Sequence, residues 1–128
     1  MENLLLERSK FTMSVDFNAE TGVLSLVGNS YPEDAISFFE PLNKWMEKYI
    51  EETKGDIIFN VKLNYLNSSS SKCFMDMFDI LEDYVEDGGK VKVNWYYFEN
   101  DDEVMEAGEE LLEDLSLDYE LIEYSEEE

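Results

Sequence analysis

A run of four serines, Ser68 to Ser71, is the part of the sequence best suited to chemistry. It follows Asn67 and lies between a predicted core strand, 57–65, and a predicted helix, 72–85. Backbone N–H groups at the start of a helix have no partner inside the helix, and the helix dipole adds partial positive charge there, so this position stabilises an anion. A phosphoserine would bring about −1.5 to −2 charge and three strong acceptor oxygens to it. A phosphate fits this position, and on a serine of the run it would change what can dock on the start of the helix.

The same run also has a purely structural interpretation. Asn and Ser are preferred N-cap residues, and a cap contributes about 1 kcal/mol to a helix without any regulatory role. Lys62 and Lys72 are the only cations close to the run in sequence. They either hold a phosphate or keep the surface solvated, so spacing alone is consistent with both interpretations of the serines.

The other reactive side chains form no catalytic or metal-binding pattern. The chain contains no histidine, which removes the commonest general base, the commonest metal ligand and every Ser-His or Cys-His nucleophile. The acidic stretch 100–103 lacks the central glycine and ligand spacing of an EF-hand loop. We therefore expect a protein that is not an enzyme and needs no cofactor or metal. An enzyme that uses carboxylates ranks last, because it would need a deep pocket with shifted acids.

The charge balance is strongly acidic. Nine Lys and Arg residues against 32 Asp and Glu residues give a formal net charge of −23, which repels nucleic acid and anionic lipid over about 8 Å at physiological salt. The apolar runs are too short for a transmembrane helix, and residues 1–3 lack the positive charge of a signal peptide. We expect a cytoplasmic protein that binds neither nucleic acid nor membrane. The alternative function is an acidic interaction protein, or nucleic-acid mimic, that binds a basic partner without phosphorylation control.

Hydrophobic periodicity predicts alternating strands and helices in a single domain. Alternation of apolar and polar residues marks strands, and apolar spacing of three and four marks helices. The expected fold is an α/β (α+β) domain over 1–128 in two layers, a mixed sheet of four to five strands with helices packed on one face, followed by a frayed acidic tail at 125–128. The predicted strands are 11–17, 23–27, 57–65, 90–98 and 119–124, and the predicted helices lie between 31 and 54, over 72–85 and over 100–112.

Three features of the predicted helices carry specific expectations. The first helix is expected to have Ser30 or Tyr31 at its N-cap, to turn Ile36 toward the core, and to kink or restart at Pro41, which cannot donate a helical hydrogen bond. Methionines in the helix after the serines, such as Met75, either fill the core or form an adaptable docking surface. The single cysteine, at position 73, is either a small buried hydrophobe or a thiol whose pKa the helix N-terminus lowers.

Three sequence blocks and one aromatic triplet give the chain a family resemblance. The blocks read Gly-Asn-Ser-Tyr-Pro-Glu-Asp at 28–34, Phe-Phe-Glu-Pro-Leu at 38–42 and Tyr-Leu-Asn-Ser-Ser-Ser-Ser-Lys at 65–72, and the triplet is Trp-Tyr-Tyr at 95–97. In order and spacing they resemble the signature blocks of the SiaC family of bacterial biofilm-regulation phosphoproteins. That family is related in fold to the STAS-type anti-sigma factor antagonists, whose regulatory serine or threonine lies where a strand meets a helix. The resemblance thus implies a STAS-like fold.

The resemblance also implies a partner-switching function. A cognate serine/threonine protein kinase would add a phosphate, a PP2C-type phosphatase would remove it, and the unmodified protein would bind and activate a diguanylate cyclase, which makes cyclic di-GMP. By the same resemblance the phosphoacceptor is Ser68, the residue after Asn67, with Ser69 as the alternative. The partner-binding surface expected around it comprises Asn67, Ser68, Ser69, Ser70, Lys72, Met75 and Asp76.

Overall fold

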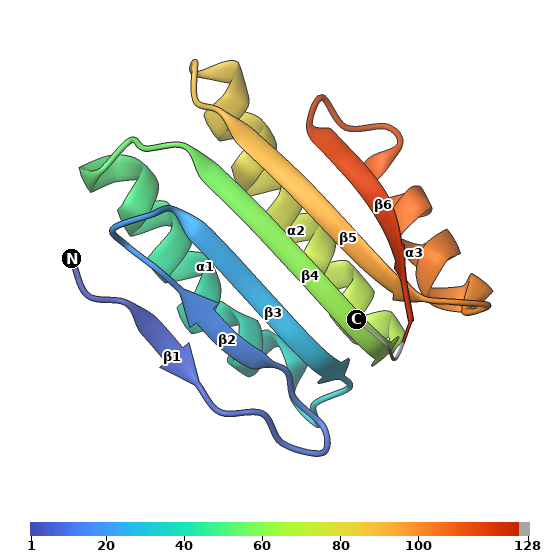
Figure 1. The fold of residues 1–128 in the computed structure, drawn as a ribbon. Coiled ribbons are helices and arrows are strands. Elements are labelled where there is room, and N and C mark those ends of the chain that lie inside the picture. The colour runs from blue at the N-terminus through green and yellow to red at the C-terminus, as the bar shows by residue number, and fades with distance from the viewer. Residues whose placement is uncertain (126–128) are drawn as a thin grey trace.

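Six strands form one mixed sheet, and three helices pack against one of its two faces (Figure 1). This computed structural model describes residues 1–125, so the predicted frayed tail lies outside the described residues except for Ser125. The predicted two-layer α/β class is confirmed, and no helix within the described residues is long and apolar enough to span a membrane. Along the chain the elements are β1 (Leu4–Leu6), β2 (Ser14–Phe17), β3 (Val23–Ser30), α1 (Ala35–Glu52), β4 (Ile57–Leu66), α2 (Ser68–Glu86), β5 (Val91–Phe98), α3 (Asp102–Leu112) and β6 (Asp118–Tyr124).

The strands lie in the sheet in the order in which they occur along the chain. β1, β2 and β3 pair antiparallel, whereas β3 to β6 pair parallel, as predicted for strands joined by helical crossovers. The predicted count of four to five strands was too low, because β1 adds an edge strand. Its three consecutive leucines show no alternation, so the pairing of Leu5 with Asp16 on β2 was invisible to periodicity.

Side chains of the central strand β4 alternate between the core and the helix-free face. Its inward residues are buried beneath the helices, and α2 contributes the apolar stripe that covers them. The predicted alternation is therefore confirmed, and the chain passes directly from the end of β4 into the first turn of α2. The inward residues are Ile57, Phe59, Val61 and Leu63 on β4, and Phe74, Met77, Phe78 and Leu81 on α2.

Helix α1 differs from its prediction in three ways. Because β3 continues to Ser30, the helix begins later, and its N-cap is Asp34 rather than Ser30 or Tyr31. Ile36 does not face the core but is 75% exposed. The helix also runs through Pro41 without restarting, because Phe39 before the proline and Leu42 after it are packed into the core.

Helix α2 begins earlier than predicted, since all four serines belong to it. Serine is a weak helix former, which placed the predicted start at Lys72. The cap outweighs that weakness, because the Asn67 side chain accepts a hydrogen bond from the backbone N–H of Ser70 at 2.9 Å. The serines therefore occupy the first turn of a helix rather than a loop before it.

Candidate phosphorylation site

Asn67 fixes the start of α2 through its side chain and through its backbone. It adopts extended backbone angles, with φ −97° and ψ 177°, and its side chain caps the helix. Its own backbone N–H donates to the carbonyl of Ser30, the last residue of β3, at 3.1 Å, and its carbonyl accepts from the N–H of Ser71 at 3.0 Å. The first turn of α2 is therefore held at one position relative to the sheet.

Ser70 lies inside the protein, not on its surface. It is fully buried, its hydroxyl donates to the Ser30 carbonyl at 2.8 Å, and it accepts from the Ser30 hydroxyl at 2.8 Å. The two hydroxyl groups are thus hydrogen-bonded to each other, and that of Ser70 is also bonded to a backbone carbonyl, in a place that water cannot reach. Ser70 is consequently removed from the predicted partner-binding surface, because neither a kinase nor a partner can reach it in the folded protein.

Ser68 and Ser69 are the exposed hydroxyls of the run, and Ser71 is half-buried. They are the first two helical residues, whose backbone N–H groups have no carbonyl one turn earlier within the helix. The two point in different directions. Residues three and four apart share a helix face, so Ser68 lies with Ser71 and Lys72, and Ser69 lies with Lys72 and Cys73.

A shallow hollow of about 210 Å³ adjoins Ser68. It joins the end of β4 and the first turns of both α2 and α3. The α3 side carries Asp101, whose carboxylate caps that helix by accepting from the Val104 N–H at 3.2 Å, and Glu103. A phosphate on Ser68 would therefore lie between the free amides of α2, which attract it, and two carboxylates, which repel it. The residues that line the hollow include Asn64, Tyr65, Asn67, Ser68, Ser71, Asp101 and Glu103.

The two nearby lysines have different surroundings. The Lys62 ammonium lies 4.3 Å from the centroid of the Tyr124 ring, on the helix-free face of the sheet, so it is engaged away from the start of α2. Lys72 is exposed and shares a helix face with Ser68. Lys72 is therefore the cation of the pair better placed to interact with a phosphate on Ser68.

Farther along α2, the side chains divide between a surface ridge and the core. Met75 is 54% exposed and Asp76 is exposed, whereas Met77 is fully buried. Cys73 is 7% exposed, and its burial, followed by the negative charges of Asp76 and Asp34, raises the pKa of its thiol. Of the two interpretations given for Cys73, a small buried hydrophobe or a thiol with a lowered pKa, the structure therefore supports the first. Met75 lies on the surface and does not fill the core.

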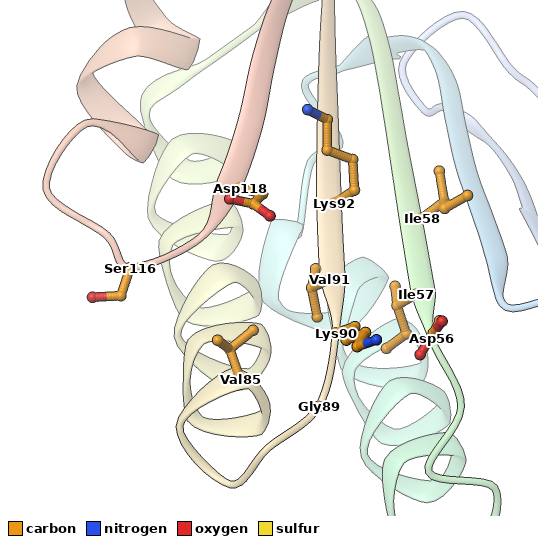
Figure 2. Close-up of a pocket in the computed structure, with 10 residues that line it drawn as sticks. All are labelled: Asp56, Ile57, Ile58, Val85, Gly89, Lys90, Val91, Lys92, Ser116 and Asp118. Atoms are coloured by element: carbon orange, nitrogen blue, oxygen red, sulfur yellow. The ribbon is translucent and has the colours of Figure 1, made fainter.

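Another hollow lies at the opposite end of the sheet (Figure 2). It measures about 480 Å³ and mixes cations with carboxylates at the amino ends of β4, β5 and β6. Lys92 at its wall is already paired with Glu120 at 2.9 Å. In sheets of this kind ligands usually bind at the carboxyl ends of parallel strands, where α2 begins. No group of three or more His, Cys, Asp or Glu side chains in the described part of the chain could hold a metal ion.

Comparison with known proteins identifies the family of this chain. The family model for SiaC family regulatory phosphoproteins matches residues 6–124. The chain belongs to the SiaC family. An uncharacterised protein of Pseudomonas aeruginosa strain UCBPP-PA14 is 31% identical to this SiaC-family chain over 119 residues, which are 93% of the chain and 94% of the relative.

Solved SiaC structures share the fold. The crystal structure of apo-SiaC from Pseudomonas aeruginosa superposes with a TM-score of 0.89 at 30% identity, covering 95% of this chain and 99% of that one. A chain in the crystal structure of the diguanylate cyclase SiaD in complex with its activator SiaC, also from Pseudomonas aeruginosa, superposes with a TM-score of 0.90 at 30% identity. That match covers 94% of this chain and 99% of the other.

Within the SiaC framework, sequence reasoning missed three residues around the candidate site. Ser30 was assigned to a cap, although continuing the alternation of β3 from Leu24 and Leu26 would have turned it inward. Asp101 and Glu103 were considered only as part of an acidic stretch that lacks the pattern of a calcium-binding loop. Their position beside Ser68 depends on how α2 and α3 pack, and no local sequence pattern contains that information.

Proposed function

We propose that this SiaC-family protein is a phosphorylation-controlled binding protein and that Ser68 is its phosphoacceptor. Its unphosphorylated form binds and activates a diguanylate cyclase, and phosphorylation switches that binding. The observation that carries the proposal is the division of the serine run: Ser68 is exposed at the first position of α2, whereas Ser70 is sealed against Ser30. The cyclase is supported by the solved complex in which SiaC is the activator of SiaD.

A phosphate on Ser68 would change the local surface by charge and by shape. The free amides of the first helical turn and Lys72 attract it, while Asp101 and Glu103 across the hollow repel it. These opposing forces hold the phosphate over the exposed ridge of α2 instead of deep in the hollow. A partner that rests on this ridge in the unmodified protein would then meet a bulky dianion.

Ser69 is the alternative acceptor, because it is also exposed and also precedes the first capped amide. Two considerations favour Ser68. It directly follows Asn67, as in the family blocks, and it lines the hollow between α2 and α3, which Ser69 does not. We assign the addition of phosphate to a serine/threonine protein kinase and its removal to a PP2C-type phosphatase, and we place the protein in the cytoplasm.

We assign the protein itself no catalytic step. The chain has no histidine, and its carboxylates serve helix caps and surface charge in the regions described above. Its output is therefore a binding event. The competing function, an acidic mimic that binds a basic partner through charge, rests on the net charge of −23. Binding of that kind would weaken steeply with salt and would ignore the state of Ser68.

The test is phosphosite mapping by mass spectrometry, on protein purified from its own cells, combined with two alanine variants. We expect phosphate on Ser68, its loss in Ser68→Ala and its retention in Ser69→Ala. Ser68→Ala should keep a diguanylate cyclase from the same cells permanently active. Phosphate found only on Ser69, or cyclase binding that is the same in phosphorylated and unphosphorylated protein, would overturn the assignment.

A further inference from the structure

The helix-free face of the sheet has no covering layer. Figure 1 shows the three helices behind the sheet, and no helix or strand within residues 1–125 covers the opposite face. Outward side chains of neighbouring strands lie side by side there, and the pairing register places one polar row through the middle of the face. That row consists of Asp16, Ser25, Asn60, Asn94 and Glu120.

The helix-free face is nearly balanced in charge, unlike the rest of the molecule. Its charged side chains are Lys62 and Lys92 together with Asp16, Asp118 and Glu120. The helix layer is strongly acidic, because α3 contains carboxylates and no cation, and α2 has a single lysine among its carboxylates. Nearly all of the net charge of −23 therefore lies outside this face. Two copies of the chain would repel each other least through it.

Polar side chains on the helix-free face are already paired with one another. The Asn94 amide donates to the Asn60 side chain at 2.9 Å, and the Lys92 ammonium donates to the Glu120 carboxylate at the same distance. Lys62 lies over an aromatic ring of the same face. Burying a polar group is costly mainly when the group loses its partners. A molecule that covered this face would leave these groups paired.

Apolar side chains lie on both sides of the polar row. Ile58, on the central strand β4, is 42% exposed, and its neighbour on β3 is Val23. The other apolar side chains of the face, Val27, Tyr96 and Ile122, are half-buried. The middle of the row is built from short serine and asparagine side chains, so a second sheet could approach to the spacing of about 10 Å that packed sheets adopt.

The helix-free face is also large enough for a dimer interface. Six strands spaced about 4.8 Å apart, each about eight residues long at about 3.3 Å per residue, cover on the order of 600 Å². Two copies would thus bury about 1,200 Å² in total, which is the lower limit of specific, stable interfaces. We therefore expect an association that is reversible at micromolar concentration.

We propose that the helix-free face binds a second copy of this chain, so that two sheets pack face to face with both helix layers turned outward. The same residues of each copy meet about a two-fold axis, and association therefore ends at the dimer. A strongly basic partner would fit the helix layer better, because the helix-free face has almost no net charge to attract it. The proposal does not depend on phosphorylation, since Ser68 belongs to the outward helix layer of both copies.

Sedimentation equilibrium of the full chain tests the dimer with a matched pair of isoleucine variants. Ile58→Asp places a carboxylate on the helix-free face, and Ile36→Asp makes the same change at a residue of α1 that is 75% exposed. Wild type should pass from monomer to dimer between about 1 and about 200 µM. We expect Ile58→Asp to weaken dimerisation by about tenfold or more and Ile36→Asp to alter it by less than about twofold. A wild-type monomer throughout, an assembly larger than a dimer, or equal effects of the two variants would overturn the proposal.

Salt dependence separates this interface from an association driven by charge. Each copy carries a net charge of −23, so the repulsion between copies falls when sodium chloride is raised from about 20 mM to about 500 mM. Dimerisation through a nearly neutral face should therefore become stronger with salt. A dimer that weakens with salt would show that opposite charges hold it together, which contradicts the proposal.

Side-chain amides of the wild-type protein locate the contact without a substitution that could disturb folding. In NMR spectra recorded over the same range of protein concentration, we expect the side-chain amide resonances of Asn60 and Asn94 to shift as the dimer forms. The side-chain amide of Asn43, on α1, should stay unchanged and serves as the control. Shifts confined to Asn43, or equal at all three residues, would place the contact elsewhere and overturn the proposal.

Discussion

Ser30 and Ser70 connect the last residue of β3 to the first turn of α2 through hydroxyl groups that water cannot reach. The Ser70 hydroxyl occupies the centre of this contact, since it donates to the Ser30 carbonyl and accepts from the Ser30 hydroxyl. Removing Ser70 therefore leaves a buried donor without an acceptor. Removing the Ser30 hydroxyl leaves the bond from Ser70 to the carbonyl intact.

Ser70→Ala should accordingly lower the free energy of unfolding by about 1–3 kcal/mol, the cost of stranding a buried polar group. Ser30→Ala should cost less, and Ser69→Ala, at an exposed position, should stay within about 0.5 kcal/mol of wild type. Urea denaturation followed by tryptophan fluorescence measures all three. If Ser70→Ala and Ser69→Ala were equally stable, the buried contact would not hold the helix start as described.

Cys73 should react slowly in the folded protein. Burial, then Asp76 and Asp34, raise the pKa of its thiol, so the thiolate fraction at a given pH is smaller than that of a free cysteine. We expect alkylation by iodoacetamide at pH 8 to be slower in native protein than in urea. The native rate should keep rising at pH values where that of a free thiol has levelled off. A native rate at pH 8 equal to that of the unfolded chain would contradict this environment.

Among the elements, α3 is positioned by the approach of Gly108 to Trp95. A Cβ atom at position 108 would lie 2.4 Å from the indole ring, and the buried indole N–H donates to the Val104 carbonyl at 2.9 Å. The same helix carries Asp101 and Glu103 to the hollow beside Ser68. A side chain at position 108 would thus displace both the core contact and one wall of the candidate site.

Gly108→Ala tests this packing, because helix propensity and packing predict opposite outcomes. Alanine is the better helix former by about 1 kcal/mol, yet overpacking costs about 1–3 kcal/mol. We expect net destabilisation in urea unfolding. Glu109→Ala, at the neighbouring exposed position, should be close to neutral. A Gly108→Ala protein more stable than wild type would show that the helix is not held this close to the indole.

The elements also show how far the sequence alone could predict this structure. Alternation correctly predicted the inward residues of β5 and those of β4 as far as Leu63, because period two is a local property of a half-buried strand. At the end of β4 it was wrong, since it placed Tyr65 on the inward face and Tyr65 is 47% exposed. It failed at β2, where Phe11 continues the apolar alternation but precedes the strand, is 49% exposed and packs edge-to-face on Tyr31. The prediction that Ile36 faces the core at the start of α1 was wrong for the same reason, since apolar spacing cannot show whether another element covers a residue.

The candidate site was predictable in part. The strand-to-helix position of the serine run follows from local pattern and from the family blocks. The inward direction of Ser70 and the approach of Asp101 to the hollow do not, because both are set by contacts between segments distant in sequence. Long-range packing therefore decides which serine of the run is accessible.

At the scale of the whole molecule, charge repulsion is the dominant electrostatic property. The formal net charge is −23, and three ion pairs occur in residues 1–125: Glu40 with Lys44, Lys48 with Glu52 and Lys92 with Glu120. All three involve exposed side chains and contribute little. The folded chain thus concentrates negative charge that the expanded unfolded chain would spread out.

Salt should therefore stabilise the fold. Raising sodium chloride from about 20 mM to about 500 mM shortens the Debye length and screens the repulsion, so the midpoint of thermal unfolding should rise. An equal osmolality of a neutral sugar separates screening from general solute effects. A midpoint that falls or stays constant with salt would show that self-repulsion is not a significant cost.

The central claim, that a phosphate on Ser68 controls partner binding, is tested most directly with protein carrying phosphoserine at that one position. Affinity for a diguanylate cyclase from the same cells should be at least about tenfold lower than for the unmodified chain. Phosphoserine installed at position 69 serves as the comparison and should have the smaller effect. Equal cyclase affinities for the unmodified and the Ser68-phosphorylated protein would contradict the account.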